Sequence, residues 1–463
     1  MAATLAPPMY NNTGVDDFVT DPFDTGAGEL PSYSRRGAVS PTPTQRSTAS
    51  QRVPREFSYD MLTRKNSPWL VLTVCGNSLL SKHAPVIVEG SELTGSVKLL
   101  LDSSDLIQSI SVSVLGLIIS GANPGDTYTF LELNQVLWAK AHSGDPRQPG
   151  SAGRFSGKLP PGEYAWPFSF AMPPEVTLYV GAGAHGAERN FRLPQTFLER
   201  HARASVQYSV VVRVVRNKLR PDSKLTATFG FLPITKPSPP SPLRQLAYQE
   251  NSPLLGPGGD PDGWHMVGQT IIRGTLFGQR PVNALCSLYI AKPLCYTRGT
   301  VLPCFMTIES PDMQALDLLS SPKAIMVRLR RNIKYHEFRT MAVDAMTWRD
   351  SVDDTDPAVW WPSTEGEEAD TLVRRHLCGE IQLKKTLKPS TAIGNFRIEY
   401  LVTLLPFDAT AFVSTDTEPL LEQAVEIATV YAPGPRPRAY SPPIYEPPVR
   451  VDPYYSPLDA AFQ

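Results

Sequence analysis

The sequence predicts an all-β protein with two antiparallel β-sandwich domains between disordered N- and C-terminal tails. The 463 residues include 46 prolines, about twice the ordinary share, and proline interrupts helix interiors while loops and sheet edges accept it. Apolar and polar residues alternate in many short segments, as in residues 110–114, which is typical of strands with one buried face. Clusters of Gly, Pro and Asp separate these segments. Sandwiches are therefore favoured over a helix bundle.

The first part of the chain divides into a tail and a sandwich. Residues 1–64 are rich in Ser, Thr, Pro and Arg and have few regularly spaced apolar positions, so we expect a disordered tail. Residues 65–235 contain repeated strand patterns and are expected to form the first sandwich. The strands expected there are 84–88, 93–101, 110–114, 128–138, 155–159, 165–170, 176–180, 206–215 and 225–231.

The second part begins with a linker. Prolines and glycines cluster within residues 236–263, which predicts a stiff connection with little secondary structure. Residues 264–432 are expected to form the second sandwich, and residues 433–463 a second proline-rich, disordered tail. Neither tail is expected to make stable contacts with the core. The strands expected in the second sandwich are 266–276, 282–291, 300–308, 324–331, 335–342, 377–383 and 396–405.

Two stretches of the second sandwich have a weaker pattern. Residues 350–370 carry eight acidic residues and no basic one, which is typical of a solvated loop. Residues 420–430 fit either a short helix or a last strand, because their periodicity matches both.

Charge and cysteine content exclude several classes of protein. Lys and Arg number 44 against 45 Asp and Glu, so we expect no nucleic-acid binding through a basic field. The five cysteines include no C-x-x-C pair, which argues against a zinc site or a disulfide framework. The N-terminus lacks the apolar core of a secretory signal, and no apolar run approaches the ~18 residues that span a bilayer. We therefore expect a cytoplasmic protein that meets membranes only through its partners.

No catalytic constellation is recognisable in the sequence. Residues 181–186 match G-x-G-x-x-G, but Pro194 follows too soon for the long helix that a dinucleotide site requires. His336 and Glu337 begin an H-E-x-x-H pattern, yet Thr340 stands at the place of the second histidine. The nucleophile elbow and the P-loop are also missing. We expect neither an enzyme nor a bound cofactor or metal.

The clearest functional signal is the pattern P-P-x-Y, which occurs once in each tail. Adjacent prolines hold a polyproline II turn before binding, so little conformational entropy is lost when the segment docks. WW domains bind such segments in an aromatic-lined groove, and the tyrosine ring fills a pocket. The expected binding residues are Pro442, Pro443 and Tyr445 as the principal motif, Pro7, Pro8 and Tyr10 as the secondary one, and Pro31 with Tyr33 as a weaker match.

A second group of short motifs concerns modification. Ser and Thr residues that directly precede a proline, the dipeptide that proline-directed kinases modify, occur in segments expected to be exposed. A phosphate there adds about −1.5 to −2 charge and can pair with nearby arginines. An unmodified Ser-Pro in a flexible segment is an equally good interpretation. The candidate sites are Ser40, Thr42, Ser238 and Ser241.

The order and spacing of several short segments resemble the arrestin family, in particular its fungal α-arrestin branch. The similarity covers roughly residues 68–432. It rests on the segments Leu93-Thr94-Gly95-Ser96-Val97, Ile110 to Gly116, Leu159-Pro160-Pro161-Gly162-Glu163-Tyr164, Trp166 to Phe170, Leu193-Pro194-Gln195-Thr196-Phe197, Val206-Gln207-Tyr208, Ile272 to Phe277 and Tyr296-Thr297-Arg298-Gly299.

This resemblance implies arrestin-like, immunoglobulin-like sandwiches and a non-catalytic adaptor. Such an adaptor recruits a WW-domain HECT-type ubiquitin ligase to plasma-membrane transporters or receptors, for ubiquitylation and endocytosis, and works from the cytoplasm at the plasma membrane and endosomes. The resemblance is equally compatible with an arrestin-like scaffold of ambient-pH or receptor signalling. A carbohydrate-binding sandwich is a third alternative, for which a cleft of stacked, exposed aromatic rings is the expected mark.

Overall fold

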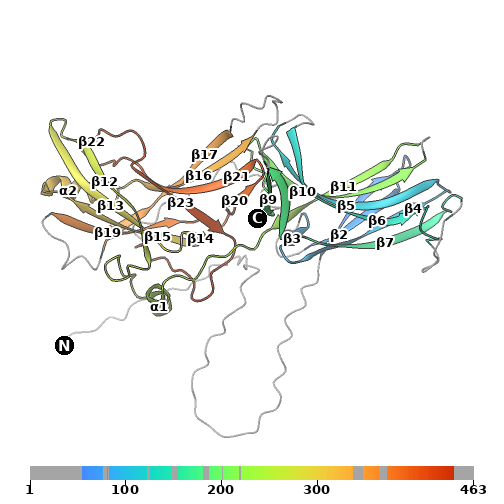
Figure 1. Cartoon of the computed structure of the whole chain (residues 1–463), viewed down its shortest axis with the longest axis horizontal. Coiled ribbons are helices and arrows are strands. Elements are labelled where there is room, and N and C mark those ends of the chain that lie inside the picture. The colour runs from blue at the N-terminus through green and yellow to red at the C-terminus, as the bar shows by residue number, and fades with distance from the viewer. Residues whose placement is uncertain are drawn as a thin grey trace, which may run out of the picture. The chain divides into compact units, whose positions relative to one another are not determined.

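The computed structural model describes residues 55–442, apart from 77–80, 82, 122–125, 147–154, 156, 181–186, 201, 218–219, 337–347 and 364–372. Strands hold 57% of the described residues and helices 5%, which confirms the all-β fold class (Figure 1). The G-x-G-x-x-G match at 181–186 lies outside the described residues.

Two sheets form the first sandwich, and the same part of the chain also contains a hairpin that is a separate two-stranded sheet. One sheet has the order β1 (Arg55–Leu62), β2 (Pro68–Gly76), β4 (Glu92–Leu101) and β7 (Gly162–Ala171). The other has the order β3 (Val86–Val88), β11 (Ser223–Leu232), β10 (Ser205–Arg216), β5 (Ile107–Ile119) and β6 (Thr127–Ala139), and the hairpin is β8 (Glu175–Val180) with β9 (Ala187–Arg192). Alternate residues of β5 are buried, so the period-two pattern of the sequence marks its core face.

The first sandwich begins earlier than the sequence suggested. Strand β1 lies within residues 1–64, which we expected to be tail, and it pairs antiparallel with β2. Phe57, Tyr59 and Met61 alternate with polar residues and point to the partly buried side of the strand. The expected strand at 155–159 is not formed; Leu159 makes only an isolated bridge to Asp105.

Two larger sheets form the second sandwich. One has the order β18 (Val359–Pro362), β19 (Arg374–Gln382), β15 (Val301–Glu309), β13 (Arg280–Ala291), β12 (Trp264–Leu276) and β22 (Phe412–Ser414). The other has the order β14 (Cys295–Thr297), β23 (Leu421–Ala428), β21 (Phe396–Leu404), β16 (Val327–His336) and β17 (Trp348–Pro357), with β20 (Thr391–Ile393) on β21; a short helix, α2 (Met313–Leu319), follows β15.

The described part of the acidic stretch 350–370, residues 350–363, is not the solvated loop that its composition suggested. It contains most of β17 and all of β18. The acids of β17 face arginines of the neighbouring β16: Asp354 lies 2.9 Å from Arg330 and Asp353 lies 3.2 Å from Arg331. Cross-strand ion pairs thus compensate for the poor strand propensity of aspartate. The ambiguous residues 420–430 form a strand, β23.

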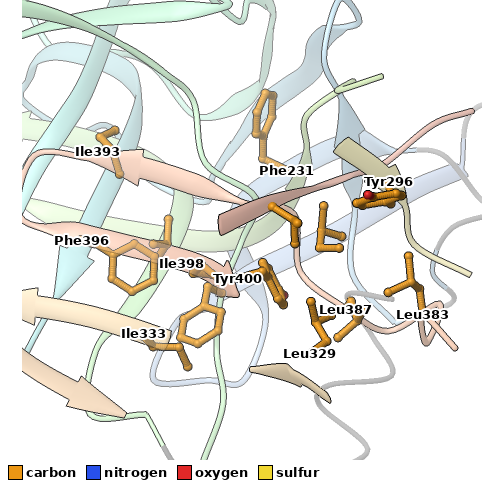
Figure 2. Packing of buried hydrophobic residues seen from close by; sticks show 14 of the residues in the cluster. Phe231, Tyr296, Leu329, Ile333, Leu383, Leu387, Ile393, Phe396, Ile398 and Tyr400 are labelled. Atoms are coloured by element: carbon orange, nitrogen blue, oxygen red, sulfur yellow. The ribbon is translucent and has the colours of Figure 1, made fainter. Parts of the chain in front are cut away.

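Most buried apolar side chains of both sandwiches belong to one hydrophobic cluster. Figure 2 shows its part around β21, where Phe396, Ile398 and Tyr400 pack with Ile333 of β16. Phe197, in the loop before β10, meets Phe396 with ring centroids 5.4 Å apart. Each such fully buried side chain stabilises the fold by about 1.5–3 kcal/mol.

Each sandwich also pairs a short early strand in parallel with its last strand. In the first sandwich β3 pairs with β11, and in the second β14 pairs with β23. This pairing fixes where the chain leaves each sandwich. The linker starts after β11, and the C-terminal segment starts after β23.

Candidate functional site

The linker contains a helix that the sequence analysis missed. Helix α1 (Pro242–Glu250) lies within residues 236–263, where we expected little secondary structure. The hydroxyl of Ser241 caps it by accepting the Arg244 backbone N–H at 3.2 Å and donates to Asp260 at 2.5 Å. Pro242 takes the first helical position, where its missing N–H is harmless. The proline that argued against structure here begins the helix.

A buried arginine anchors α1 on the second sandwich. Arg244 is 3% exposed; its guanidinium donates to the backbone carbonyl of Lys292 at 2.9 Å and lies over the ring of Trp264, 4.8 Å from the centroid. Burial lowers the pKa of Arg244, although nearby acidic groups oppose this shift. The buried guanidinium of Arg244 therefore holds the linker helix on the second sandwich through Lys292 and Trp264.

The C-terminal strap, which we define as residues 429–442, lies against this helix and the second sandwich. We expected no stable contacts for the tail from residue 433, and this is wrong as far as Pro442. At its start, Thr429 exchanges hydrogen bonds with Thr235, the residue just before the linker; the Thr235 N–H donates to the Thr429 hydroxyl at 2.8 Å. The Thr297 hydroxyl of β14 donates to the carbonyl of Val430 at 2.9 Å. These bonds fix the first two residues of the strap.

The far end of the strap docks on α1 through one tyrosine. The ring of Tyr440 stacks on that of Tyr248, with centroids 6.4 Å apart and planes 16° from parallel. The Tyr440 hydroxyl donates to the backbone carbonyl of Ala247 at 3.2 Å. Because Tyr248 is itself buried, its ring offers Tyr440 a fixed surface.

Beside this tyrosine stack lies a buried carboxylate, Glu380 of β19, which is 1% exposed. Its two oxygens accept the backbone N–H groups of Tyr440 at 2.7 Å and of Ser441 at 3.2 Å. Burial raises the pKa of Glu380, while the hydrogen bonds from Tyr440 and Ser441 lower it. Within the described part of the chain, no Lys, Arg or His forms an ion pair with this carboxylate. Its hydrogen-bond donors all come from the strap.

The hollows near these elements include a small cavity and a more open groove. A small cavity of about 50 Å³ lies between linker, α1, β14 and strap, and its lining includes Ser238, Arg244, Tyr296 and Pro437. A more open groove of about 380 Å³ follows β12, β13, β15 and β19. In the groove Phe305 is buried and meets Tyr289 edge to face, so these rings do not form the exposed stack expected of a carbohydrate site.

Few of the residues expected to bind or to be modified lie in the described part of the chain. Pro442 is its last residue and is half-buried; Ser238 is exposed, and Ser241 is the helix cap described above. The structure brings Ser238 and the strap to the same small cavity. The remaining candidates lie outside the described residues: Pro443, Tyr445, Pro7, Pro8, Tyr10, Pro31, Tyr33, Ser40 and Thr42.

Sequence reasoning missed Glu380, Tyr440 and Ser441. A signal for the first was present, because Glu380 stands in the middle of the predicted strand 377–383, next to apolar Ile381. An acid at such a position requires a hydrogen-bonding partner. The dipeptide of Ser441 and Pro442 was also visible, but nothing in the sequence connects it to Glu380.

No protein-family model matches this chain, and no curated protein matches it. Among the described residues, no helix is long and apolar enough to cross a membrane. The same residues contain no group of three or more His, Cys, Asp or Glu side chains that is arranged to hold a metal ion.

Proposed function

We propose that this protein is an arrestin-like, non-catalytic adaptor that recruits a WW-domain HECT-type ubiquitin ligase to membrane transporters or receptors. One observation carries the proposal. The principal P-P-x-Y motif begins at Pro442, the last residue of the C-terminal strap that Glu380 and helix α1 hold against the second sandwich. The first proline of the motif therefore belongs to a segment that is docked on the folded body.

The arrangement of motif and body supports an adaptor in a second way. A ligand segment tethered to a folded body raises the local concentration of whatever binds the body beside whatever binds the segment. The all-β body supplies broad sheet surfaces for cargo, and the resemblance of residues 68–432 to arrestins is the reason to expect cargo of the transporter or receptor class.

Affinity arguments favour the use of both motifs. A single short P-P-x-Y segment binds a WW domain at about micromolar strength, near −8 kcal/mol. A ligase with several WW domains can engage the motifs of Tyr10 and Tyr445 together, and this gives avidity without new contacts. Prolines on both sides of Tyr445 favour extended geometry, whereas Asn11 and Asn12 follow Tyr10, so the C-terminal motif should bind more tightly.

The test combines peptide titration with cargo ubiquitylation. Synthetic peptides around Tyr445 and Tyr10 are titrated against isolated WW domains, and ligase recruitment is compared between wild type and Tyr445→Ala, with or without Tyr10→Ala. We expect Tyr445→Ala to lose most recruitment and the double variant nearly all. Tyr454→Ala, in the same tail but outside the motif, is the matched control. If Tyr445→Ala binds and ubiquitylates like wild type, the adaptor function is wrong.

A further inference from the structure

Ser441 lies near the end of the strap and directly precedes the principal motif. It precedes Pro442 directly, which makes it a Ser-Pro dipeptide, and its backbone N–H is bound to Glu380 at 3.2 Å. Both Ser441 and Pro442 are half-buried in the docked strap. A change at Ser441 therefore acts on the docking contact and on the first proline of the motif together.

We propose that Ser441 is a phosphorylation site for a proline-directed kinase and that the phosphate releases the C-terminal strap from Glu380. The consequence for WW-domain binding rests on the proposed function above; the release itself does not. In the transfer, the γ-phosphorus of ATP forms a bond to Ser441 Oγ as its bond to the bridging oxygen of ADP breaks. ADP leaves, and the kinase base takes the hydroxyl proton.

Kinase access requires only a local opening of the strap. End segments with few buried apolar contacts open at low free energy while the rest of the fold stays intact. The strap fits this description, because at its far end the docking contacts described above are the Tyr440 stack and the hydrogen bonds of Tyr440 and Ser441. The kinase captures the open segment, and the phosphate then opposes closure.

Closure is opposed because the phosphate would return next to a buried carboxylate. A phosphoserine carries about −1.5 to −2 charge at pH 7, and placed beside an acid it disrupts by like-charge repulsion and desolvation. The titratable groups coupled to Glu380 are Cys304 on β15, Tyr248 on α1 and Tyr440 on the strap, and none of these is a cation. Arg438 of the strap is exposed and donates to Asn251. The buried cation of α1, Arg244, donates to the carbonyl of Lys292 and lies over the ring of Trp264, and within the described residues no ion pair joins it to Glu380.

Release changes what a WW domain can reach. The aromatic-lined groove of a WW domain must contact the proline pair directly. In the docked state Pro442 is half-buried, and the backbone of the preceding Ser441 is bound to Glu380 of β19, so this contact is hindered. In the docked state the affinity of the motif is reduced by the fraction of molecules whose strap is open. Phosphorylation at Ser441 removes this reduction.

The experiment uses the full-length protein with Ser238→Ala, so that phosphate on this exposed serine, which lines the same small cavity as the strap, does not contribute. A proline-directed kinase with ATP and Mg²⁺ is added, the modified residue is mapped by mass spectrometry, and hydrogen exchange is followed for the amides of residues 430–441. We expect phosphate on Ser441 and a fall in protection of these amides of about tenfold or more, equivalent to about 1.4 kcal/mol per tenfold. Ser441→Ala should keep its protection under the same treatment.

Glu380→Gln separates repulsion from other causes of release. The amide keeps the shape of the side chain and one acceptor oxygen but removes the negative charge. Phosphorylation of this variant should lower strap protection much less than phosphorylation of the Glu380 protein. If phosphorylation lowers strap protection equally in the two proteins, charge repulsion from Glu380 is not the cause of release. Full protection of a strap that carries phosphate would also contradict the proposal. If Ser441 carries no phosphate while exposed Ser-Pro sites are phosphorylated, Ser441 is not a phosphorylation site.

Binding to an isolated WW domain tests the consequence. Phosphorylation should tighten binding of the full-length protein severalfold and leave binding of a peptide of residues 438–450 within about twofold, because the peptide has no strap to release. If neither peptide form binds any WW domain, the proposed function fails, and the exchange measurement still decides the release. If the peptide binds and the phosphorylated protein gains nothing, the strap does not control the motif.

Discussion

Each sandwich contains a buried carboxylate, and the two are satisfied in opposite ways. Asp105 of the first sandwich is 9% exposed and pairs with Arg216 at 2.9 Å and Arg220 at 3.2 Å. Arg216 is held in turn by Ser223 and by the ring of Trp69. Glu380 of the second sandwich receives its hydrogen bonds from the backbone of the C-terminal strap.

Asp105 is therefore a structural acid of the first sandwich, whereas the hydrogen bonds of Glu380 come from a segment that can detach. Asp105 and its main partner, Arg216 of β10, both belong to the first sandwich, so their contact breaks only when that sandwich opens. The strap can leave Glu380 while both sheets of the second sandwich remain intact, because water then replaces the N–H donors. Buried ionic groups are expensive unless they are paired. Whether the buried carboxylate of Glu380 has hydrogen-bond donors from the protein therefore depends on whether the strap is docked.

The largest expected effect is at the structural acid. Asp105→Ala leaves the mostly buried guanidinium of Arg216 without its carboxylate, and we expect a loss of about 3 kcal/mol in the free energy of unfolding. Urea unfolding measures it, and Asp105→Asn, which keeps one acceptor oxygen, should lose less. Hydrogen exchange of the strap amides should not change. A loss below about 1 kcal/mol would mean that Asp105 is no more important than an exposed acid.

The second effect is local. Glu380→Ala removes both acceptors of the strap, and we expect strap docking to weaken by about 1–2 kcal/mol, since charge-assisted bonds are lost while the desolvation of a carboxylate is avoided. Exchange of the amides of residues 430–441 should accelerate while the amides of β21 stay protected. Simultaneous loss of protection in β21 would show that Glu380 supports the whole sandwich.

A smaller effect follows from the pKa of Glu380, which burial raises above its ordinary value. The folded protein then binds a proton more tightly than the unfolded chain, so stability falls as the pH rises. The contribution is fully present below the ordinary pKa of Glu, about 4.3, and is lost as the pH rises through the raised value. Unfolding of wild type and Glu380→Gln across this range should show the wild type losing stability relative to the variant. Parallel curves would contradict the raised pKa.

The sequence predicted most strands because their burial follows a simple alternation. The core faces of β5 and β21 were visible as apolar residues that alternate with Ser, Arg or Glu. It failed where tertiary contacts override composition. The acids of β17 are compatible with a strand only because Arg330 and Arg331 stand opposite them, and the linker prolines hid a helix whose stability depends on the buried Arg244.

The candidate site was predictable in one half only. The P-P-x-Y motif is a local pattern: Pro442 and Tyr445 are only three positions apart, so the motif can be recognised from the sequence alone. The docking contact joins Glu380 to residues sixty positions further along the chain. Neither the spacing nor the type of these residues predicts that Glu380 contacts Tyr440 and Ser441. A backbone N–H donor carries no side-chain identity, so such contacts leave no trace in the sequence.

The smallest expected effect distinguishes the tyrosine of the strap from those of the sandwiches. Tyr208 donates its hydroxyl to the carbonyl of Pro194 at 2.7 Å and Tyr400 to that of Lys388 at 2.6 Å, both inside a core, whereas Tyr440 reaches Ala247 at 3.2 Å from a half-buried position. Tyr440→Phe keeps the stack on Tyr248 and removes only this longer bond, so we expect strap docking to weaken by about 0.5 kcal/mol.

Strap amide exchange measures this change, and Tyr440→Ala, which also loses the stack, is the matched comparison with a loss about 1 kcal/mol larger. The global free energy of unfolding should not change in either variant, since the strap opens before the sandwiches do. Tyr208→Phe should lower it, because the buried carbonyl of Pro194 then has no donor in place of the hydroxyl. If Tyr440→Phe destabilises the whole protein as much as Tyr208→Phe, the strap is part of the core and is not a detachable segment.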